Sequence, residues 1–341
     1  MAAVRTSPGR ALRGFLQVAF GLSALAVFFW RIDVGEVLAH LASVEIGWAL
    51  LALLIFTASK LLHGWRWWVF LGRAEVPRVQ LMAVFLLSNM ANALLPLRAG
   101  DLLRVEVPSR RFGIPRSTLV SSVFVVESVL DLFVFAILLV VALFLADLPV
   151  VLRPLVGLIG LAAIVLFGAV VVLARARKDL AAIARRVLRP LPERLSEGVA
   201  GRLPAFVDGM ASLRTNRQAA RVVAVSLAAW LVEVVVYWLL ARAFHVDLGV
   251  SQALILMIAA NLIVSLPLTP WSIGPYELVV TEALVVLGAG RVEAGAFALG
   301  SHLMLQAWIG ITGTAAMLWL RLGWRDLLPG RHTPPPAPGE L

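Results

Sequence analysis

Long apolar runs separated by arginine-rich segments restrict the fold of this chain more than any other feature. Runs long enough to cross a bilayer lie near residues 15–30, 46–65, 117–145, 150–174, 219–244 and 295–320. Hydrophobic residues make up 61% of the 341 residues and charged residues only 15%, which excludes an ordinary soluble enzyme. Because hydrocarbon offers no hydrogen bonds to the backbone, the sequence predicts an all-α polytopic membrane protein.

Two further apolar segments, 79–116 and 250–290, are interrupted by proline and glycine. The first breaks at Pro96, continues into Arg98, Gly100 and Asp101, and ends its charged stretch at Arg104. Proline removes a backbone donor, and glycine tolerates torsion angles that other residues avoid. Ionisable side chains at membrane depth are tolerated only inside protein or beside a watery cavity, so we expect a polar or charged lipid headgroup there.

The distribution of arginines predicts the topology. Arginines flank segment 79–116 on both sides, at positions 66, 73 and 78 before it and at 104, 110, 111 and 116 at its end. The positive-inside rule therefore places both ends in the cytoplasm, which makes the segment re-entrant. Loop 175–218 holds ten Arg or Lys residues against four acidic residues, so we expect a basic, amphipathic cytoplasmic loop.

The same rule orients the rest of the chain. Residues 1–14 are expected to form a cytoplasmic N-terminus, and residues 321–341 a disordered cytoplasmic tail. Residues 15–320 then form one transmembrane domain in the bacterial inner membrane, with residues 31–45 as a loop outside.

The second broken segment repeats the order of residue types in the first. Asn261, Pro267, Pro270, Gly274 and Glu277 follow the same order of Asn, Pro, Gly and acid that is found around the first break. A span, a broken segment and a span recur in opposite directions over 46–145 and 219–320. This order predicts about six full transmembrane helices plus two re-entrant broken helices in an inverted repeat, with a site near the midplane. Alternatively, 250–268 and 276–290 are two ordinary crossings.

Ionisable residues within the apolar segments are the candidate site. Glu127 and Asp131 are four residues apart and share one helix face, and Arg98 and Arg104 are their expected partners. In the functional interpretation, arginine holds a phosphate and the acids tune it or shuttle protons. In the structural interpretation, the same residues form an ion-pair cluster that fixes the broken segment. Glu277 is expected to face the same cavity from the second half.

Other polar and aromatic residues receive structural interpretations. Lys60 and His63 are expected to reach toward the headgroup layer, and Trp67 to act as an interfacial anchor. His302 lies in an uncharged run, and we interpret it as a buried, hydrogen-bonded histidine.

The sequence holds none of the common catalytic motifs. Zinc-protease, Walker, dinucleotide-binding and serine-hydrolase signatures are missing, as are acidic clusters typical of divalent-metal sites. The chain has no cysteine, which excludes disulfides and thiol nucleophiles. Its net charge of +10 lies mainly at span ends and in one loop, so nucleic acid is not an expected partner. We therefore expect neither an enzyme nor a metal or cofactor.

These motifs resemble those of the flippase-like, lysylphosphatidylglycerol synthase transmembrane-region family over roughly residues 15–320. Pro96, Arg98, Gly100, Asp101 and Arg104 match a signature similar to P-x-R-x-G-[DE]-x-x-R, with Asp101 where Glu is usual.

Two further patterns support the resemblance. Glu127 and Asp131 match an E-x-x-x-D pattern, although serine occupies position 128, where relatives often have arginine. Pro270, Gly274 and Glu277 match a pattern similar to S-P-G-G-x-G-x-x-E, in which Trp-Ser at 271–272 replaces the Gly pair.

The resemblance implies lipid handling by a standalone member without the fused synthase domain. The first hypothesis is translocation of a phospholipid or lipid-linked headgroup between leaflets. The alternative is an accessory subunit that binds a lipid and presents it to a glycosyl or aminoacyl transferase. The candidate partners are accordingly a membrane lipid, a lipid-modifying enzyme and a second copy of the chain.

Overall fold

The computed structural model describes residues 8–95, 98–145, 153–175, 215–266 and 268–323. Every regular element in these ranges is helical, as the sequence predicted. Several predicted features lie wholly or largely outside the described residues: Pro96, Pro267, the basic loop within 175–218, the first residues of the N-terminus and the C-terminal tail.

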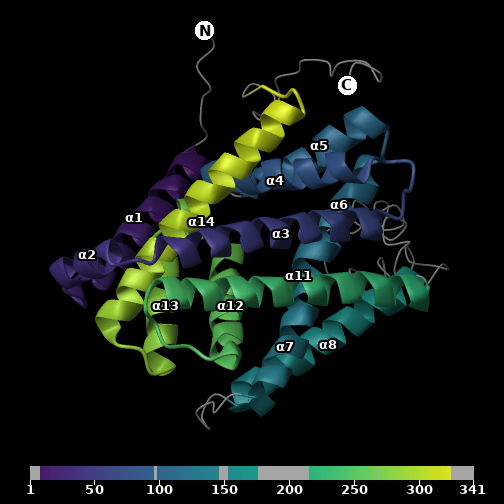
Figure 1. Ribbon diagram of the computed structural model, residues 1–341. Coiled ribbons are helices and arrows are strands. Elements are labelled where there is room, and N and C mark those ends of the chain that lie inside the picture. The colour runs from purple at the N-terminus through teal and green to yellow at the C-terminus, as the bar shows by residue number, and fades with distance from the viewer. Residues whose placement is uncertain (1–7, 96–97, 146–152, 176–214, 267, 324–341) are drawn as a thin grey trace. The chain divides into compact units, whose positions relative to one another are not determined.

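Among the described residues, four helices are long and apolar enough to cross a membrane, which agrees with a multi-pass membrane protein (Figure 1). Three are single elements: α3 (Ile46–Leu71), α11 (Asn216–Ala243) and α14 (Arg291–Trp319). The fourth covers Arg116–Ala142 and combines α6 (Arg116–Phe124), η2 (Val125–Leu130) and most of α7 (Asp131–Leu145). These helices lie where the sequence predicted spans at 46–65, 219–244, 295–320 and 117–145.

The N-terminal region differs from the prediction of one span followed by a loop at 31–45. Helix α1 (Pro8–Trp30) is followed by a second helix, α2 (Val34–Ala42), and the axes of Leu16–Trp30 and α2 differ by 88°. Asp33 starts α2 because its carboxylate accepts a hydrogen bond from the backbone N–H of Glu36 at 3.0 Å. This N-cap satisfies a donor that a loop would leave to water, and composition alone did not reveal it.

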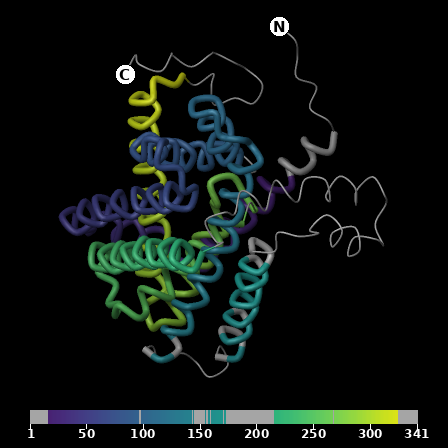
Figure 2. Tube along the Cα trace, turned by 90° about the vertical axis from the view of Figure 1, so that its right-hand side faces the viewer, coloured from purple at the N-terminus to yellow at the C-terminus, as the bar shows by residue number. Residues whose placement is uncertain are grey.

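Helix α8 (Arg153–Arg175) forms where the sequence predicted a span at 150–174. It lies beside α7 in both views (Figures 1 and 2), and the rings of Phe133 and Phe167 stack with centroids 4.0 Å apart. That α8 crosses the membrane stays a prediction.

Both predicted breaks are present. Helix α4 (Arg78–Leu94) ends just before the first break, and α5 (Gly100–Phe112) begins directly after it. At the second break, α12 (Val250–Ser265) is followed by the short η5 (Pro270–Ser272) and by α13 (Pro275–Val286). The broken helices are therefore confirmed, while their re-entrant course and the inverted repeat stay predictions.

The chain divides into two compact units. Unit 1 comprises residues 1–58, 89–99 and 232–314, and unit 2 comprises 59–88, 100–231 and 315–341. Helices α3, α11 and α14 each contribute residues to both units. Arg104, Glu127 and Asp131 belong to unit 2, whereas Arg98 and Glu277 belong to unit 1.

A close backbone contact fixes the second break within unit 1. Gly274 has a φ of 92°, and a Cβ atom built there would lie 2.4 Å from the carbonyl oxygen of Gly21 in α1. Gly21 is also tightly packed, since its Cβ would lie 3.1 Å from the Ile273 oxygen. Only glycine fits at position 274, so α1 and the start of α13 pack backbone to backbone.

We expect Gly274→Ala to destabilise the protein strongly, because it adds a steric clash to an unfavourable φ. Gly288→Ala is the matched control, since Gly288 has a φ of 102° and nothing within 4 Å of an added Cβ. The control should cost about 1 kcal/mol or more from backbone conformation alone. In a thermal-stability assay by fluorescence-detected size exclusion, G274A should melt clearly below G288A. Equal melting temperatures would contradict the proposed contact.

Candidate functional site

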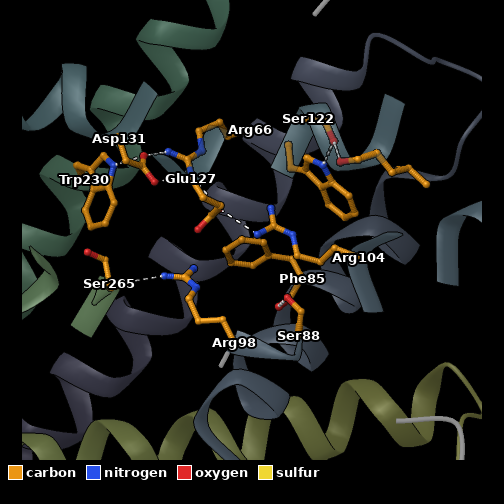
Figure 3. Close-up of polar contacts among 12 residues, drawn as sticks. Arg66, Phe85, Ser88, Arg98, Arg104, Ser122, Glu127, Asp131, Trp230 and Ser265 are labelled. Atoms are coloured by element: carbon orange, nitrogen blue, oxygen red, sulfur yellow. Dashed lines mark hydrogen bonds and ion pairs between the residues drawn. The ribbon is translucent and has the colours of Figure 1, made fainter. Parts of the chain in front are cut away.

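Four charged side chains in unit 2 form a buried cluster, which we call the charged cluster: Arg66, Arg104, Glu127 and Asp131. Figure 3 shows the Arg66–Asp131 and Arg104–Glu127 pairs. The residues come from α3, α5, η2 and the first position of α7. Two positive and two negative side chains offset one another, which is how ionisable groups persist inside a membrane protein.

Arg66 joins both acids of the cluster. Its guanidinium contacts both carboxylate oxygens of Asp131, with Nη2 3.2 Å from Oδ2, and the same Nη2 lies 3.4 Å from Glu127 Oε1. The indole N–H of Trp230 donates to Asp131 Oδ1 at 2.8 Å. Asp131 is thus held by a bidentate arginine and an aromatic donor, an arrangement that fixes its orientation.

Arg104 lies in an aromatic cage and forms one ion pair. Its guanidinium carbon is 4.7 Å from the ring centroid of Trp67 and 4.8 Å from that of Phe85. Nη1 lies 3.0 Å from Glu127 Oε1. Among the described residues, Nε and Nη2 of Arg104 have no hydrogen-bond partner, although the residue is only 1% exposed.

Close packing of α3 and α4 builds this cage. A Cβ atom at Gly64 would lie 2.9 Å from Cα of Met82, so the two helices touch at their backbones. Trp67 and Phe85 lie three residues further along their respective helices, on the same faces as this contact. The indole N–H of Trp67 donates to Ser122 Oγ at 3.0 Å, which fixes the plane of the ring against Arg104.

Glu127 is the accessible member of the cluster. Its side chain is 20% exposed, against 9% for Asp131 and 1–2% for the two arginines. It lies in η2, a π-helical turn within an otherwise α-helical span, and such turns are frequent at functional sites. A ligand that approaches the charged cluster therefore meets Glu127 first.

The structure brings together three predicted site residues, Arg104, Glu127 and Asp131. Arg98, the other expected partner of the acids, has a φ of 54° and donates from Nη1 to the carbonyl oxygen of Ser265 at 3.3 Å within unit 1 (Figure 3). Asp101 lies in the first turn of α5 and is half-buried.

Glu277, the site residue predicted at the second break, lies in unit 1. Glu277 is buried in the first turn of α13 and pairs with His302 of α14, whose Nδ1 lies 2.6 Å from Glu277 Oε1. The interpretation of His302 as a buried, hydrogen-bonded histidine is therefore confirmed. Glu282, in contrast, is accessible and pairs with Arg31 and Arg291.

Three residues were misinterpreted or missed. Arg66 counted only as a topological marker, whereas it is fully buried at the centre of the cluster. Trp67, predicted as an interfacial anchor, is also fully buried, and His63, predicted near the headgroups, packs against Phe85 and Trp230. The apolar residues 69–71 that follow Arg66 were the available signal, because they continue the helix beyond it.

Within the described residues, no group of three or more acids, histidines or cysteines could hold a metal ion. Nε and Nη2 of Arg104, which have no hydrogen-bond partner among the described residues, form the edge with which arginine binds a carboxylate or a phosphate in two-pronged geometry.

The sequence comparisons agree with the motifs. The family described as "Lysylphosphatidylglycerol synthase TM region" matches residues 14–313. The chain is also 29% identical over 332 residues to a protein named glycosyltransferase AglD from Haloferax volcanii. That alignment covers 88% of this chain and 53% of the relative, so the chain spans about half of the relative's length.

We expect Arg66→Met to destabilise the protein by about 3–5 kcal/mol, because it leaves the buried Asp131 carboxylate without its cation. The measurement is the melting temperature in detergent.

Arg116→Met is the control, since Arg116 pairs at 2.9 Å with Glu106 but is largely exposed. The Arg116 hydrogen bond holds the pKa of the Glu106 carboxyl below its ordinary value, yet solvent screens such a pair. R116M should therefore melt close to the wild type. If R66M has the same melting temperature as R116M, the buried Arg66–Asp131 pair does not stabilise the protein.

Proposed function

We propose a lipid-translocating function, starting from the premise that the chain belongs to the lysylphosphatidylglycerol synthase TM region family. In this proposal the charged cluster of unit 2 binds the phosphate of a phospholipid or lipid-linked headgroup, and the chain moves that lipid between the two leaflets. Family membership and the several apolar helices support a lipid-related role in a membrane.

The observation that carries the proposal is the state of Arg104. A buried guanidinium with two N–H-bearing atoms lacking partners among the described residues is costly, since each unsatisfied buried donor loses its hydration. The rings of Trp67 and Phe85 hold the guanidinium but cannot accept these hydrogen bonds at its edge. A phosphate oxygen at that edge would satisfy both atoms and bring the compensating negative charge.

Glu127 supplies a means of release. It already lies near both arginines, at 3.0 Å from Arg104 and 3.4 Å from Arg66. A phosphate on Nε and Nη2 of Arg104 repels the carboxylate that pairs with Nη1, and the carboxylate can then move fully to Arg66. Its return to Nη1 would weaken the attraction between Arg104 and the phosphate, so binding and release proceed without leaving an unpaired buried charge.

The other sequence predictions extend this proposal. Arg98, Asp101 and Glu277 stay candidate headgroup contacts at the two breaks, and both breaks are proposed to be re-entrant. The inner-membrane location, the cytoplasmic termini and a homodimer likewise stay predictions.

A second candidate function is presentation of a bound lipid to a separate transferase. The relative from Haloferax volcanii, which is named a glycosyltransferase and is about twice as long as the aligned part, favours this alternative. Both functions need the same phosphate site, and only translocation needs lipid to change leaflets. The two functions are therefore separated by measuring binding and exchange on the same variants.

For binding, we expect Arg104→Gln to weaken affinity for phosphatidylglycerol by at least about tenfold, the equivalent of one charge-assisted hydrogen bond. Arg110→Gln is the matched control, because Arg110 lies on the same helix but pairs with Glu106 at the surface. Affinity can be measured by titrating the lipid into detergent-solubilised protein under native mass spectrometry. If R104Q and R110Q bind alike, the assignment of the phosphate to Arg104 is wrong.

For exchange, we expect Glu127→Gln to bind phosphatidylglycerol at least as tightly as the wild type but to slow its passage between leaflets. The amide cannot compete with phosphate for Arg104 as a carboxylate does. Dithionite bleaching of fluorescent phosphatidylglycerol in proteoliposomes reports the exchange rate. Wild-type vesicles that exchange no faster than protein-free vesicles, while binding persists, would favour the accessory function and reject translocation.

A further inference from the structure

A buried carboxylate–imidazole pair in unit 1 lies outside the charged cluster. Glu277 and His302 are 2% and 4% exposed, and Glu277 Oε1 lies 2.6 Å from His302 Nδ1. The other carboxylate oxygen accepts the backbone N–H of Gly274 at 2.6 Å. On the far side of the imidazole, His302 Nε2 lies 3.3 Å from Nε2 of Gln306, one helical turn further along α14.

The hydrogen-bond pattern determines where the protons are. Gln306 Nε2 also lies 3.2 Å from the carbonyl oxygen of Trp271, which can only accept. The glutamine nitrogen must therefore face both Trp271 and His302, so His302 Nε2 accepts a hydrogen bond and carries no proton. His302 Nδ1 then donates to Glu277, both of whose oxygens are acceptors, and the pair as a whole carries one negative charge.

An added proton conflicts with this pattern. Protonation of His302 Nε2 would set an N–H donor against the N–H donor of Gln306. The amide can resolve the conflict by turning its oxygen toward His302, but that oxygen would then also face the Trp271 carbonyl, and two acceptors repel each other. Protonation thus removes the hydrogen bond that Gln306 makes to Trp271.

Aromatic side chains surround the imidazole of His302, with an acid nearby in the same unit. The Tyr276 ring stacks on His302 with centroids 4.1 Å apart, which suits a cation. Glu233 and Tyr237 on α11 are buried, and the Tyr276 hydroxyl lies 3.4 Å from Ser301 Oγ. Protonation converts a buried net negative charge into an ion pair, which lowers the cost of burial.

Trp271, whose carbonyl accepts the Gln306 hydrogen bond, and the next residue, Ser272, have a strained backbone. Trp271 and Ser272 have φ values of 58° and 56°, in the left-handed region that disfavours residues other than glycine. Contacts with α1 and α12 hold them, together with the Gln306 bond and a bond from Thr269 Oγ1 to the Ile273 carbonyl at 3.0 Å. Loss of the Gln306 bond would let Trp271, whose side chain is 42% exposed, move away.

We propose that Glu277, His302 and Gln306 form a proton-responsive latch, which holds the segment 268–272 at high pH and releases it when His302 takes up a proton. This inference does not rest on the lipid-binding proposal, because it concerns unit 1 alone and its readout needs no lipid substrate.

The test uses a spin label, which this chain accepts cleanly because it has no cysteine. Leu268→Cys, at a 36% exposed position, carries the label, and Val286→Cys at the far end of α13 reports on general changes. Spectra of the full chain in nanodiscs are recorded from about pH 8.5 to about pH 4.5. We expect the label at 268 to become mobile as pH falls, with no change at 286.

Three variants in the L268C background complete the test. H302Q cannot titrate and should keep the label immobile throughout, whereas H40Q removes a histidine on α2 and should behave like the parent. Q306L keeps the titrating pair but not the bond to Trp271, so its label should be mobile at every pH. The proposal is overturned by a parent spectrum that does not change with pH, by an H302Q transition like the parent's, or by an immobile label in Q306L.

Discussion

The contact between Arg66 and its two carboxylates is the interaction on which the organisation of unit 2 depends. It joins α3 to the span built from α6, η2 and α7, with Glu127 linking onward to Arg104 on α5. Charges buried at this depth must stay paired, so these helices cannot separate without exposing one of them. Apolar packing in a membrane is less directional, because lipid tails compete for the same surfaces. The ion pairs therefore specify which helices meet and in which register.

In unit 1, a backbone contact specifies which helices meet. The start of α13 is fixed by the approach of Gly274 to Gly21 and by the Glu277 carboxylate, which accepts the Gly274 N–H. Glu277 thereby stabilises the positive end of a helix as well as pairing with His302. Each unit thus contains an acid next to a helix break or irregular turn, held by a basic partner from another helix.

The sequence was sufficient for the helical fold, for both breaks and for three of the four residues of the charged cluster. Apolar run length predicts spans well, and proline with glycine marks breaks, because both signals are local. Arg66 could not be identified in this way, since an arginine near a span end resembles a topological marker until the partner helix is placed. Helix α2 was not predicted for a similar reason: only one residue, the N-cap Asp33, distinguishes a short helix from a loop in this sequence.

The π-helical turn at Val125–Leu130 also has a consequence for how this span tolerates change. A π turn contains one residue more than the α-helix would need over the same rise. Removing one residue from it would restore an uninterrupted α-helix and rotate everything on one side by about 100° relative to the other. Asp131 and the α7 face that meets α8 would then no longer point the same way relative to Glu127. The extra residue therefore sets the rotation of the α7 face that meets α8 relative to Glu127, which pairs with Arg104.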